Sequence, residues 1–351
     1  MPSRRRAQRS RILSLLDQFE PALARAFREA IDGIRGDAIL AEIEAAVATG
    51  RADAVMRALR LDRAAFMQLE TGIQQAYTSA GADKAAALAR SGRAAGQNVV
   101  FRFDMRNPSA ERWLAQHSAT RITGPMGMIE DQRSAIRIAL EAGMRRGENP
   151  RTTALDLVGR INRVTGRREG GIIGLSSPQT DAVIRAREEL FSGNKTLLRK
   201  YLARERRDRR FDRAVLKAIN EGGKVPRDIA AKAAQRYSDR LFQLRGETIA
   251  RTEALESLHA GQHEAMKQLV ESGQVTAEQV IRIWNDSGDG RVRDDHREMD
   301  GQKVGMNEPF TFPDKSRAMY PGDGSLGAPP EQIILCRCWA DEQVDWLAGV
   351  R

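Results

Sequence analysis

The last third of the sequence holds the residues whose types and spacing suit metal chemistry. Cys336 and Cys338, the two cysteines of the chain, are one residue apart, and His296 and Asp300 precede them. Residues two apart on a strand face the same side, so both thiols would point together. Residues four apart on a helical turn share a face, so His296 and Asp300 would do so as well. Because zinc accepts imidazole, carboxylate and thiolate ligands, these four residues are candidate ligands of a structural zinc.

A pair of buried thiols without metal is the alternative interpretation. Structural zinc sites usually space their cysteines by two to four residues, and free cysteine is also a common small buried side chain. A disulfide is disfavoured, because residues two apart on a strand seldom reach the required geometry and nothing in the sequence indicates export. The loop Asp286–Gly290 lacks the alternating acids and distal glutamate of a calcium loop, so it is interpreted as a turn.

Three elements must position these candidate ligands. The run Ile281–Trp284 is β-branched and aromatic and ends at a Gly/Asp-rich turn, which predicts a strand. Ile333–Trp339 alternates well enough to predict another strand. The longest predicted helix, Pro226–Val270, with a break expected near Gly246, carries an apolar stripe that needs a covering surface. We therefore expect a small mixed α/β module at the C-terminal end, docked against a long helix.

The ordered motifs of this region resemble those of a known family. They are Ile249-Ala250-Arg251-Thr252-Glu253, Trp284, Arg293-x-x-His296-x-x-x-Asp300-Gly301-Gln302, Pro309-Phe310, Tyr320-Pro321-Gly322-Asp323 and Cys336-Arg337-Cys338-Trp339. In this order they are similar to the phage Mu F-like minor head, or head morphogenesis, proteins of tailed bacteriophages and prophages. The resemblance implies a virion protein that works with portal protein and with major capsid protein or scaffold, and it implies no established catalytic activity.

Charged residues of the motifs are candidates for docking the module onto the long helix. Glu253 could form an ion pair with Arg293 or Arg337, whereas the plainer interpretation gives Arg251 and Glu253 a role in helix solubility only. The candidate docking residues are Arg251, Glu253, Arg293, Asp300 and Arg337.

The strongest cluster of positive charge lies between Lys195 and Asn220, and its candidate contacts are Arg204, Arg206, Arg207, Arg209 and Arg210. Helical spacing would place Arg204 beside Asp208, so part of this charge is expected to be neutralised on a solvated helix face. Net positive charge remains after such pairing. The cluster is thus the first candidate for contact with double-stranded DNA or an acidic partner.

Outside this region the sequence predicts mostly helices. Apolar residues recur three and four apart from Ile12 to Ile34, and further helices are expected over 37–49, 62–90, 126–146, 151–164 and from Ser177. Phe101, Phe103 and Met105 alternate with polar residues, which predicts a short strand within 98–107. The fold class is α+β and predominantly α-helical, with an extended helical N-terminal region. The expected domains are 1–106, 107–225 with its glycine-rich connector, and 226–351.

Two other segments resemble functional motifs but lack residues that those motifs require. The glycine-rich segment Gly166–Leu175 lacks the lysine and hydroxyl residue of a phosphate loop, so a flexible connector is expected there. His259 and His263 lie four apart on the long helix, but Ala260 stands where a metalloprotease helix has glutamate. A packed histidine is the better interpretation of His259.

Composition limits the function classes further. The chain has 351 residues, a net charge of +10 and only 5% aromatic residues, so thin cores between helices are expected. No apolar run is long enough to cross a bilayer, which predicts no membrane partner and assembly in the host cytoplasm. We expect a structural protein of the phage head that is not an enzyme. The alternatives are a DNA-binding internal head protein acting in packaging or ejection, and a metal-dependent nuclease or toxin-like effector.

Overall fold

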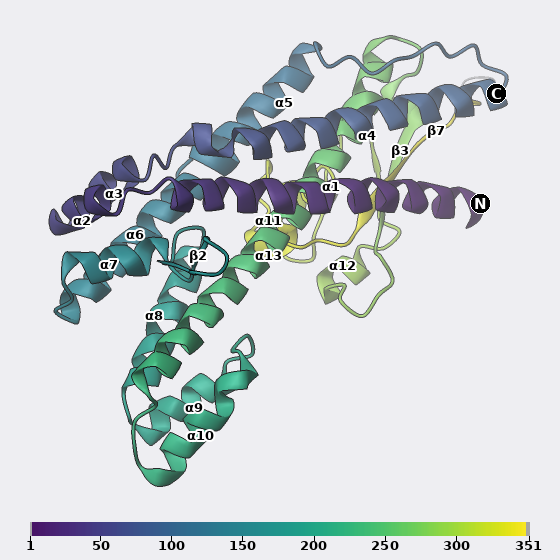
Figure 1. Cartoon of the computed structure of the whole chain (residues 1–351). Helices are drawn as coiled ribbons and strands as arrows, with labels where there is room; N and C mark the ends of the chain where they lie inside the picture. The colour runs from purple at the N-terminus through teal and green to yellow at the C-terminus, as the bar shows by residue number, and fades with distance from the viewer. Residues whose placement is uncertain (1, 349–351) are drawn as a thin grey trace. The chain divides into compact units, whose positions relative to one another are not determined.

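The computed structural model describes residues 2–348, with side chains from Gln8 onward (Figure 1). The chain forms two compact units, each built from separate stretches of sequence. Unit 1 contains residues 1–25, 69–116 and 247–351, and unit 2 contains residues 26–68 and 117–246. Helix dominates and the sheets are small and antiparallel, so the predicted α+β, mostly helical class is confirmed. No helix in the described part of the chain is long and apolar enough to span a membrane.

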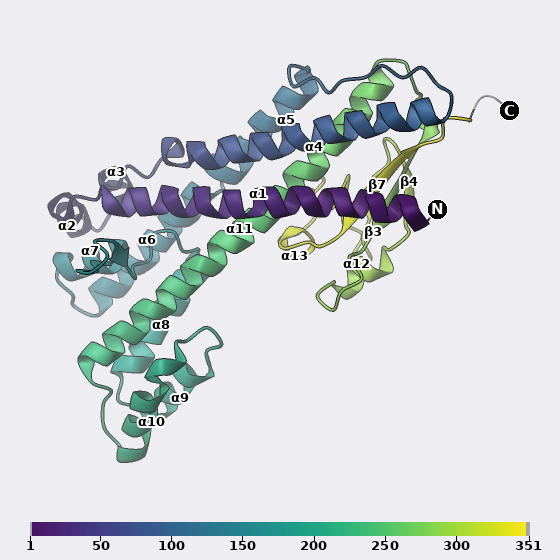
Figure 2. The same ribbon diagram turned by 45° about the vertical axis from the view of Figure 1, so that its right-hand side comes forward.

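Unit 1 is built on three long helices. They are α1 (Pro2–Gly36), α4 (Met67–Ala94) and α11 (Arg227–Glu271), and α1 and α11 also contribute residues to unit 2. The predicted break near Gly246 is absent, because α11 is one uninterrupted helix. Along α1 the apolar stripe buries Ile12, Leu16 and Leu23, and α1 and α4 lie side by side in Figures 1 and 2.

Close helix packing in unit 1 depends on glycine. A Cβ atom at Gly72 of α4 would lie 2.6 Å from Leu23 of α1, and one at Gly261 of α11 would lie 2.1 Å from the carbonyl oxygen of Tyr77. Alanine and glycine thus allow backbones to approach where a larger side chain would separate them. This close approach of the helices gives the thin core that the composition predicts.

The segment after α4 is extended but forms no strand, so the strand predicted within 98–107 is wrong. Side-chain amides of two glutamines take the place of a neighbouring strand. Gln268 on α11 accepts from the N–H of Asp104 and donates to its carbonyl, both at 2.9 Å. Gln274 bonds both backbone groups of Val100 in the same way, at 3.1 and 3.0 Å. The alternating apolar side chains still pack inward, and Phe103 lies 5.9 Å from the ring of Tyr77.

The C-terminal module of unit 1 contains a three-stranded antiparallel sheet in the order β4-β3-β7. Its strands are β3 (Val280–Asn285), β4 (Lys303–Gly305) and β7 (Trp339–Val344), and β5 (Phe310–Thr311) pairs with β6 (Arg317–Ala318). The strand predicted over Ile281–Trp284 is confirmed, with Trp284 opposite Ala340. The strand predicted over Ile333–Trp339 is wrong, because α13 (Pro330–Ile333) and a loop precede β7.

A buried arginine ties the sheet to its loops. Arg282 lies on the same face of β3 as Val280 and Trp284 and is fully buried. Its guanidinium donates to the carbonyls of Gly305 at 3.0 Å, Met319 at 2.5 Å and Glu308. A buried charge is tolerated only when its donors find acceptors, so Arg282 fixes three segments at once.

Unit 2 is a bundle of shorter helices. Its complete helices are α2 (Leu40–Ala48), α3 (Ala52–Ala58), α6 (Met128–Arg145), α7 (Pro150–Val158), α8 (Ser177–Phe191), α9 (Lys195–Ala203) and α10 (Asp212–Glu221). Asn149 caps α7 by accepting the N–H of Thr152, and Ser176 forms a capping box with Gln179 at the start of α8. These caps explain why the sequence located both helix starts correctly.

Shorter elements complete the described chain. They are α5 (Pro108–Ser118), α12 (Asp294–Glu298), the turns of helix η1 (Arg63–Phe66), η2 (Ala119–Thr123), η3 (Arg209–Phe211) and η4 (Ala277–Gln279), and the hairpin strands β1 (Arg160–Ile161) and β2 (Arg168–Glu169).

The glycine-rich segment is ordered and largely buried, so the expected flexible connector is wrong. A Cβ atom at Gly171 would lie 2.5 Å from the backbone nitrogen of Gly159. Arg168 donates to the carbonyls of Gly159 at 3.1 Å and Ala38 at 3.3 Å. The glycines therefore serve close backbone packing beneath the hairpin β1–β2.

Candidate metal centre

Three of the four predicted zinc ligands converge inside the C-terminal module. His296 lies on α12, and Cys336 and Cys338 lie in the loop before β7. Nδ1 of His296 is 3.3 Å from Sγ of Cys338 and 3.6 Å from Sγ of Cys336. The three donor atoms lie within 4.8 Å of one another, and all three residues are buried. The two thiols point together as expected, although no strand carries them.

Asp300 does not join this cluster, so the prediction of a shared helix face is wrong. Helix α12 ends at Glu298, and Asp300 stands in the following turn with an exposed side chain. Its Oδ1 accepts the backbone N–H of Asp286 at 3.0 Å, which closes the turn after β3. Because the helix ends before Asp300, His296 and Asp300 do not share a helix face.

Gln332 orients the imidazole of His296, a role that the sequence analysis missed. Nε2 of Gln332 donates to the carboxylates of Asp295 at 2.9 Å and Asp314 at 3.0 Å. Its Oε1 therefore faces Nε2 of His296, at 3.0 Å, and that nitrogen must be the donor. The remaining nitrogen, Nδ1, is thus directed at the two thiols. Such an outer hydrogen bond fixes the ring of metal-binding histidines.

Aromatic rings enclose the cluster. Trp284 meets the His296 ring edge-on at a centroid distance of 5.7 Å, and Phe312 lies 5.4 Å from it. In this pocket the pKa of Cys336 lies well below its ordinary value, because its hydrogen bond with Cys338 outweighs burial and His296 adds to the effect. The pKa of Cys338 is raised by its hydrogen bond with Cys336 and by burial. The pair therefore favours one thiolate, the form of cysteine that binds metals.

The donor set fits zinc in type but supplies three ligands among the described residues. Structural zinc sites have four protein ligands, whereas sites with three leave one position for water or another donor. An imidazole oriented by its outer nitrogen and two converging sulfurs satisfy the chemistry of such a site. The same arrangement also forms a stable buried hydrogen-bonded cluster by itself.

Two of the predicted docking arginines bond within the module. Arg337 pairs with Asp289, with Nε 2.7 Å from Oδ2, and this hydrogen bond is the main cause that lowers the pKa of Asp289 to about 2. Arg293 donates to the carbonyl of Ile334. Both arginines thus have partners inside the module, and Glu253 itself is buried on α11. The bonds of Arg293 and Arg337 therefore join segments of the module to one another.

Other residues of α11 contact the module. Oγ1 of Thr252, between the two predicted docking residues, accepts the N–H of Leu335 at 3.1 Å. Arg251 instead pairs with Glu20 of α1 at 3.0 Å. Two turns after Thr252, His259 is buried, donates from Nδ1 to the carbonyl of Leu255 at 3.0 Å, and has its pKa lowered to about 4, mainly by burial. It is the packed histidine that the sequence predicted.

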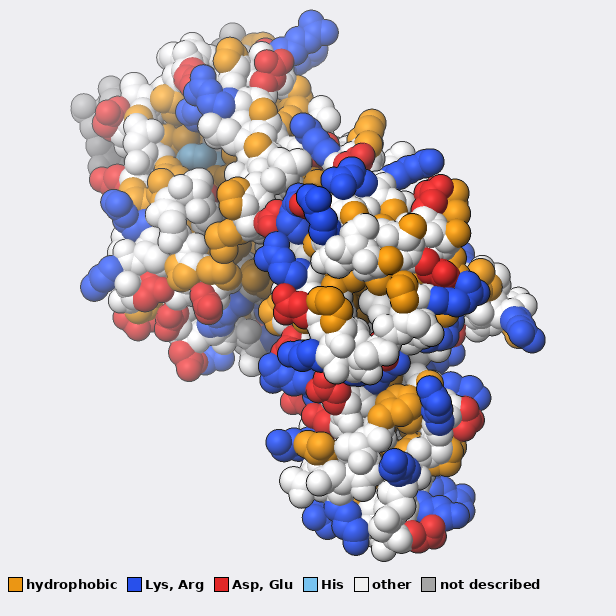
Figure 3. Space-filling view, turned by 90° about the vertical axis from the view of Figure 1, so that its left-hand side faces the viewer, with side chains coloured by type: hydrophobic (Ala, Val, Ile, Leu, Met, Phe, Trp, Pro, Cys, Tyr) orange, Lys and Arg blue, Asp and Glu red, His pale blue; other side chains and the backbone are white. Residues whose placement is uncertain are grey.

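The basic cluster of unit 2 is not helical throughout, because residues 204–208 separate α9 from η3. Arg204 therefore does not pair with Asp208; it binds Glu189 at 2.7 Å. Arg207 binds Asp212 at 2.9 Å, and Arg210 binds Asp208 at 2.5 Å. Arg206 and Arg209 are exposed and form no ion pair among the described residues. Figure 3 shows acidic and apolar side chains interspersed with the basic ones on the face that it presents.

Comparison with known proteins identifies the C-terminal part of the chain. No curated protein and no solved structure matches the sequence. The motifs and the cysteine–histidine cluster, up to Trp339, fall inside the one segment that a protein family model matches. Residues 209–340, in the C-terminal part of the chain, match the family model of Phage Mu protein F like protein, which confirms the resemblance that the motifs of this region carry.

Proposed function

We propose that this protein is a structural component of a tailed-phage head, which acts in head morphogenesis by contacting portal protein and major capsid protein or scaffold. The single observation that carries the proposal is the family match over residues 209–340. On this proposal the protein assembles in the host cytoplasm and becomes part of the virion. It has no substrate of its own.

The construction of the C-terminal module supports a docking role. Arg282 is satisfied by three carbonyls, Thr252 holds the loop before the cysteines, and Lys84 of α4 donates to the carbonyl of Glu342 at 2.7 Å. A module braced by buried bonds presents a fixed surface, and a preorganised surface loses little conformational freedom on binding. Such rigidity suits a protein whose task is to occupy a defined position in a shell.

Co-sedimentation with purified proheads tests the proposal. The full-length protein is mixed with proheads that contain portal, before and after DNA filling, and with proheads that lack portal. We expect retention on portal-containing proheads without DNA. The proposal would be removed if the fraction of protein in the pellet were the same with every prohead preparation as in a protein-only control. Retention that requires DNA would favour the alternative below.

DNA binding inside the head is a second candidate function, favoured by the exposed and unpaired state of Arg206 and Arg209 within the described residues. Two guanidinium groups that neutralise no protein carboxylate are free to contact phosphate, and such contacts weaken as salt rises. This candidate requires salt-sensitive binding of double-stranded DNA that depends on these two residues.

We also propose that His296, Cys336 and Cys338 hold a zinc ion that stabilises the module, with water or another donor in the fourth position. The proposal rests on the convergence of the three donors and on the orientation of His296 by Gln332. Zinc would link α12 to the loop before β7 and so stabilise the module. A metal-dependent nuclease or toxin-like activity is the remaining alternative, and it requires DNA cleavage by the zinc-loaded protein that His296→Ala abolishes.

A further inference from the structure

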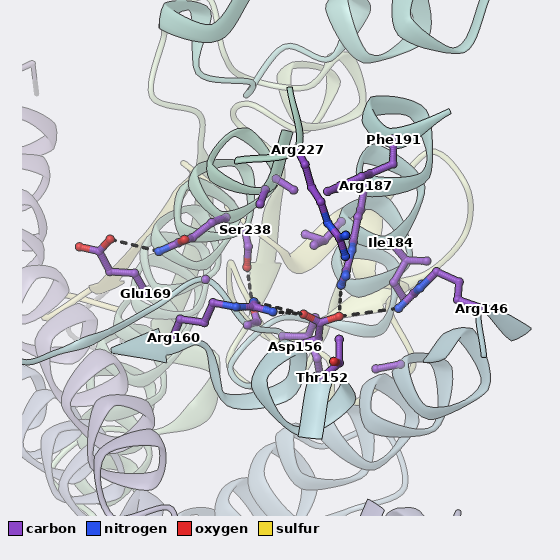
Figure 4. Close-up of a pocket in the computed structure, with 18 residues that line it drawn as sticks. Arg146, Thr152, Asp156, Arg160, Glu169, Ile184, Arg187, Phe191, Arg227 and Ser238 are labelled. Atoms are coloured by element: carbon purple, nitrogen blue, oxygen red, sulfur yellow. Dashed lines mark hydrogen bonds and ion pairs between the residues drawn. The ribbon is translucent and has the colours of Figure 1, made fainter. Parts of the chain in front are cut away.

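A cavity of about 270 Å³ lies within unit 2, apart from the cysteine–histidine cluster. Residues of α6, α7, α8, the hairpin β1–β2 and the first turns of α11 line it, and Figure 4 draws the lining residues in close-up. Its size is slightly below the range of roughly 300–1,000 Å³ that small-molecule sites usually have. The cavity therefore has room for a single small ligand.

Arginine dominates the polar part of the lining. The four guanidinium groups are those of Arg146, Arg160, Arg187 and Arg227, and the lining carboxylates are those of Asp156 and Glu169. Four positive charges face these two negative ones and that of Glu148, which binds Arg146 and Arg187 from outside the lining, so an excess of one positive charge remains. Such an excess around a cavity favours an anionic ligand.

The carboxylate of Asp156 lies between three of these arginines (Figure 4). Arg160 donates to its Oδ1 at 3.2 Å, Arg187 binds its Oδ2, and Nη2 of Arg146 lies 3.8 Å from Oδ2. Glu148, behind the lining, accepts from Arg146 and Arg187, both at 3.0 Å. The three arginines are thus held in fixed orientations, yet Nη1 of Arg146 is buried and has no hydrogen-bond partner among the described residues.

Arg227 is the arginine that the protein itself leaves uncompensated. It is the first residue of α11, where the helix dipole already disfavours a positive charge, and it forms no ion pair among the described residues. In Figure 4 its side chain reaches toward Arg187. The pKa of Arg187 is lowered by burial and also by the charges of Arg146 and Arg227, although Glu148 opposes this change. An anion between these guanidinium groups would relieve their repulsion.

Apolar side chains form one part of the remaining lining, beside the polar Thr152, Gln235 and Ser238. Phe191, Ile184 and Ile172 contribute side chains to the cavity, and the guanidinium carbon of Arg187 lies 5.8 Å from the centre of the Phe191 ring. Inorganic phosphate would leave this apolar surface uncovered. A ligand that joins a phosphate group to a flat or apolar body would cover both parts.

We propose that this cavity binds a small phosphomonoester of about mononucleotide size, with its phosphate between Arg187 and Arg227 and its body against Phe191. Arginine is suited to this role because its planar fork can donate two parallel hydrogen bonds to a phosphate. The proposal concerns unit 2 alone, and it does not depend on the proposed role in the phage head.

Isothermal titration calorimetry on the full-length protein tests the proposal, with deoxyadenosine monophosphate as the probe. We expect saturable binding of this nucleotide, weaker binding of inorganic phosphate and no binding of the uncharged nucleoside deoxyadenosine. Oligonucleotides with a 5′-phosphate or a 5′-hydroxyl distinguish a free nucleotide from a DNA end. Binding of the phosphorylated oligonucleotide in preference to the mononucleotide would overturn the small-molecule assignment.

Variants locate the binding in the cavity. Arg227→Gln should weaken binding by about tenfold or more, because it removes a charge-assisted hydrogen bond to phosphate. Glu169→Gln should tighten binding by about twofold to fivefold, because it removes a negative charge of the lining. The amide oxygen can still accept from Asn162, which donates to Glu169 at 2.7 Å, whereas the contacts of Glu169 with Gln235 and Arg236 are lost.

The matched control is Arg185→Gln, on the same helix as Arg187. Arg185 is 66% exposed, pairs with Asp181 and does not line the cavity. It should bind the nucleotide as the wild-type protein does. An equal loss in Arg185→Gln and Arg227→Gln, or no measurable binding by the wild-type protein at millimolar nucleotide, would overturn the proposal.

Discussion

Oε1 of Glu342 on β7 lies 2.9 Å from Nδ1 of His263 on α11, and this buried pair joins the last strand to the long helix. Burial by itself would raise the pKa of Glu342. The hydrogen bond and charge of His263, together with the charges of Lys84 and Arg282, outweigh that effect and lower the pKa to about 2. His263 therefore bonds to a carboxylate of β7, and its spacing from His259 does not form a metalloprotease site.

The depressed pKa of Glu342 predicts how unfolding depends on pH. The ordinary pKa of 4.5 is higher than the folded value of about 2, so the folded state binds fewer protons between these values. Glu342 therefore contributes stability above about pH 4.5 that is lost as the pH falls toward 2, on the order of 2–3 kcal/mol in total. Urea unfolding of the wild type and of Glu342→Gln from pH 3 to pH 7 measures this contribution.

The matched control for this experiment is Glu298→Gln, which changes an exposed carboxylate of the same module. It should keep the wild-type dependence on pH. If the difference in unfolding free energy between the wild type and Glu342→Gln is as large at pH 3 as at pH 7, the titration of Glu342 does not govern the acid response.

Replacing both cysteines by serine should destabilise the C-terminal module, whether they bind zinc or only pack. Both thiols are buried, so serine places hydroxyl groups in an apolar pocket and removes any thiolate ligands. Thermal unfolding, with and without a chelator, measures the effect. If zinc is bound, the chelator should lower the melting temperature of the wild type and leave the double variant unchanged, and elemental analysis should find stoichiometric zinc only in the wild type.

Gln332 should act as a positioning residue for any metal at this site. Gln332→Ala removes the acceptor that fixes His296, and loss of such an outer partner typically lowers metal affinity by about tenfold to a hundredfold. Competition with a coloured chelator measures the affinity, and Glu331→Ala, at an exposed neighbouring position, is the control. An unchanged affinity in Gln332→Ala would assign Gln332 a packing role only.

The local sequence patterns predicted the elements whose cause is local. Periodicity located α1 and α11, the cap at Asn149 located the start of α7, and the β-branched run before the turn at Asp286 located β3. These features depend on residues that are neighbours in sequence, so the pattern contains the whole cause.

Features that depend on distant partners escaped prediction. Gln268 and Gln274 replace a strand beside the extended segment, and Gln332 reaches His296, because the fold brings these amides to their partners. Arg282 has the alternation of a solvent-facing residue in sequence, yet three distant carbonyls make its burial favourable. The sequence nevertheless groups the thiols and His296 correctly, since they are the only cysteines and the only histidine after α11.

Gly261 should be intolerant of substitution. In a helix interior, Gly→Ala usually stabilises by roughly 0.5–1 kcal/mol. Here the added methyl carbon would lie 2.1 Å from the Tyr77 carbonyl oxygen, so α4 and α11 must move apart. We expect Gly261→Ala to destabilise by about 1–3 kcal/mol, the usual cost of overpacking, as measured by urea unfolding. Gly33→Ala in α1, where no atom lies within 4 Å of the added carbon, should show no such loss.

Arg206 and Arg209 provide the last test, which concerns the DNA-binding alternative. Each phosphate contact adds about one to the slope of the logarithm of affinity against the logarithm of salt concentration. If both arginines contact DNA, Arg206→Gln with Arg209→Gln should weaken binding and reduce that slope by about two. Fluorescence anisotropy with a labelled duplex, between roughly 50 and 200 mM salt, gives the slope.

The control for this test removes two positive charges elsewhere in unit 2. Lys217 and Lys232 are 71% and 68% exposed, and each lies near an acidic residue one helical turn away. Lys217→Gln with Lys232→Gln changes the net charge by the same amount, so equal effects of the two double variants would indicate a general attraction to DNA. A reduced slope in the arginine variant alone would place the contact at residues 206 and 209, where the chain leaves α9 and the two guanidinium groups are not paired within the described residues.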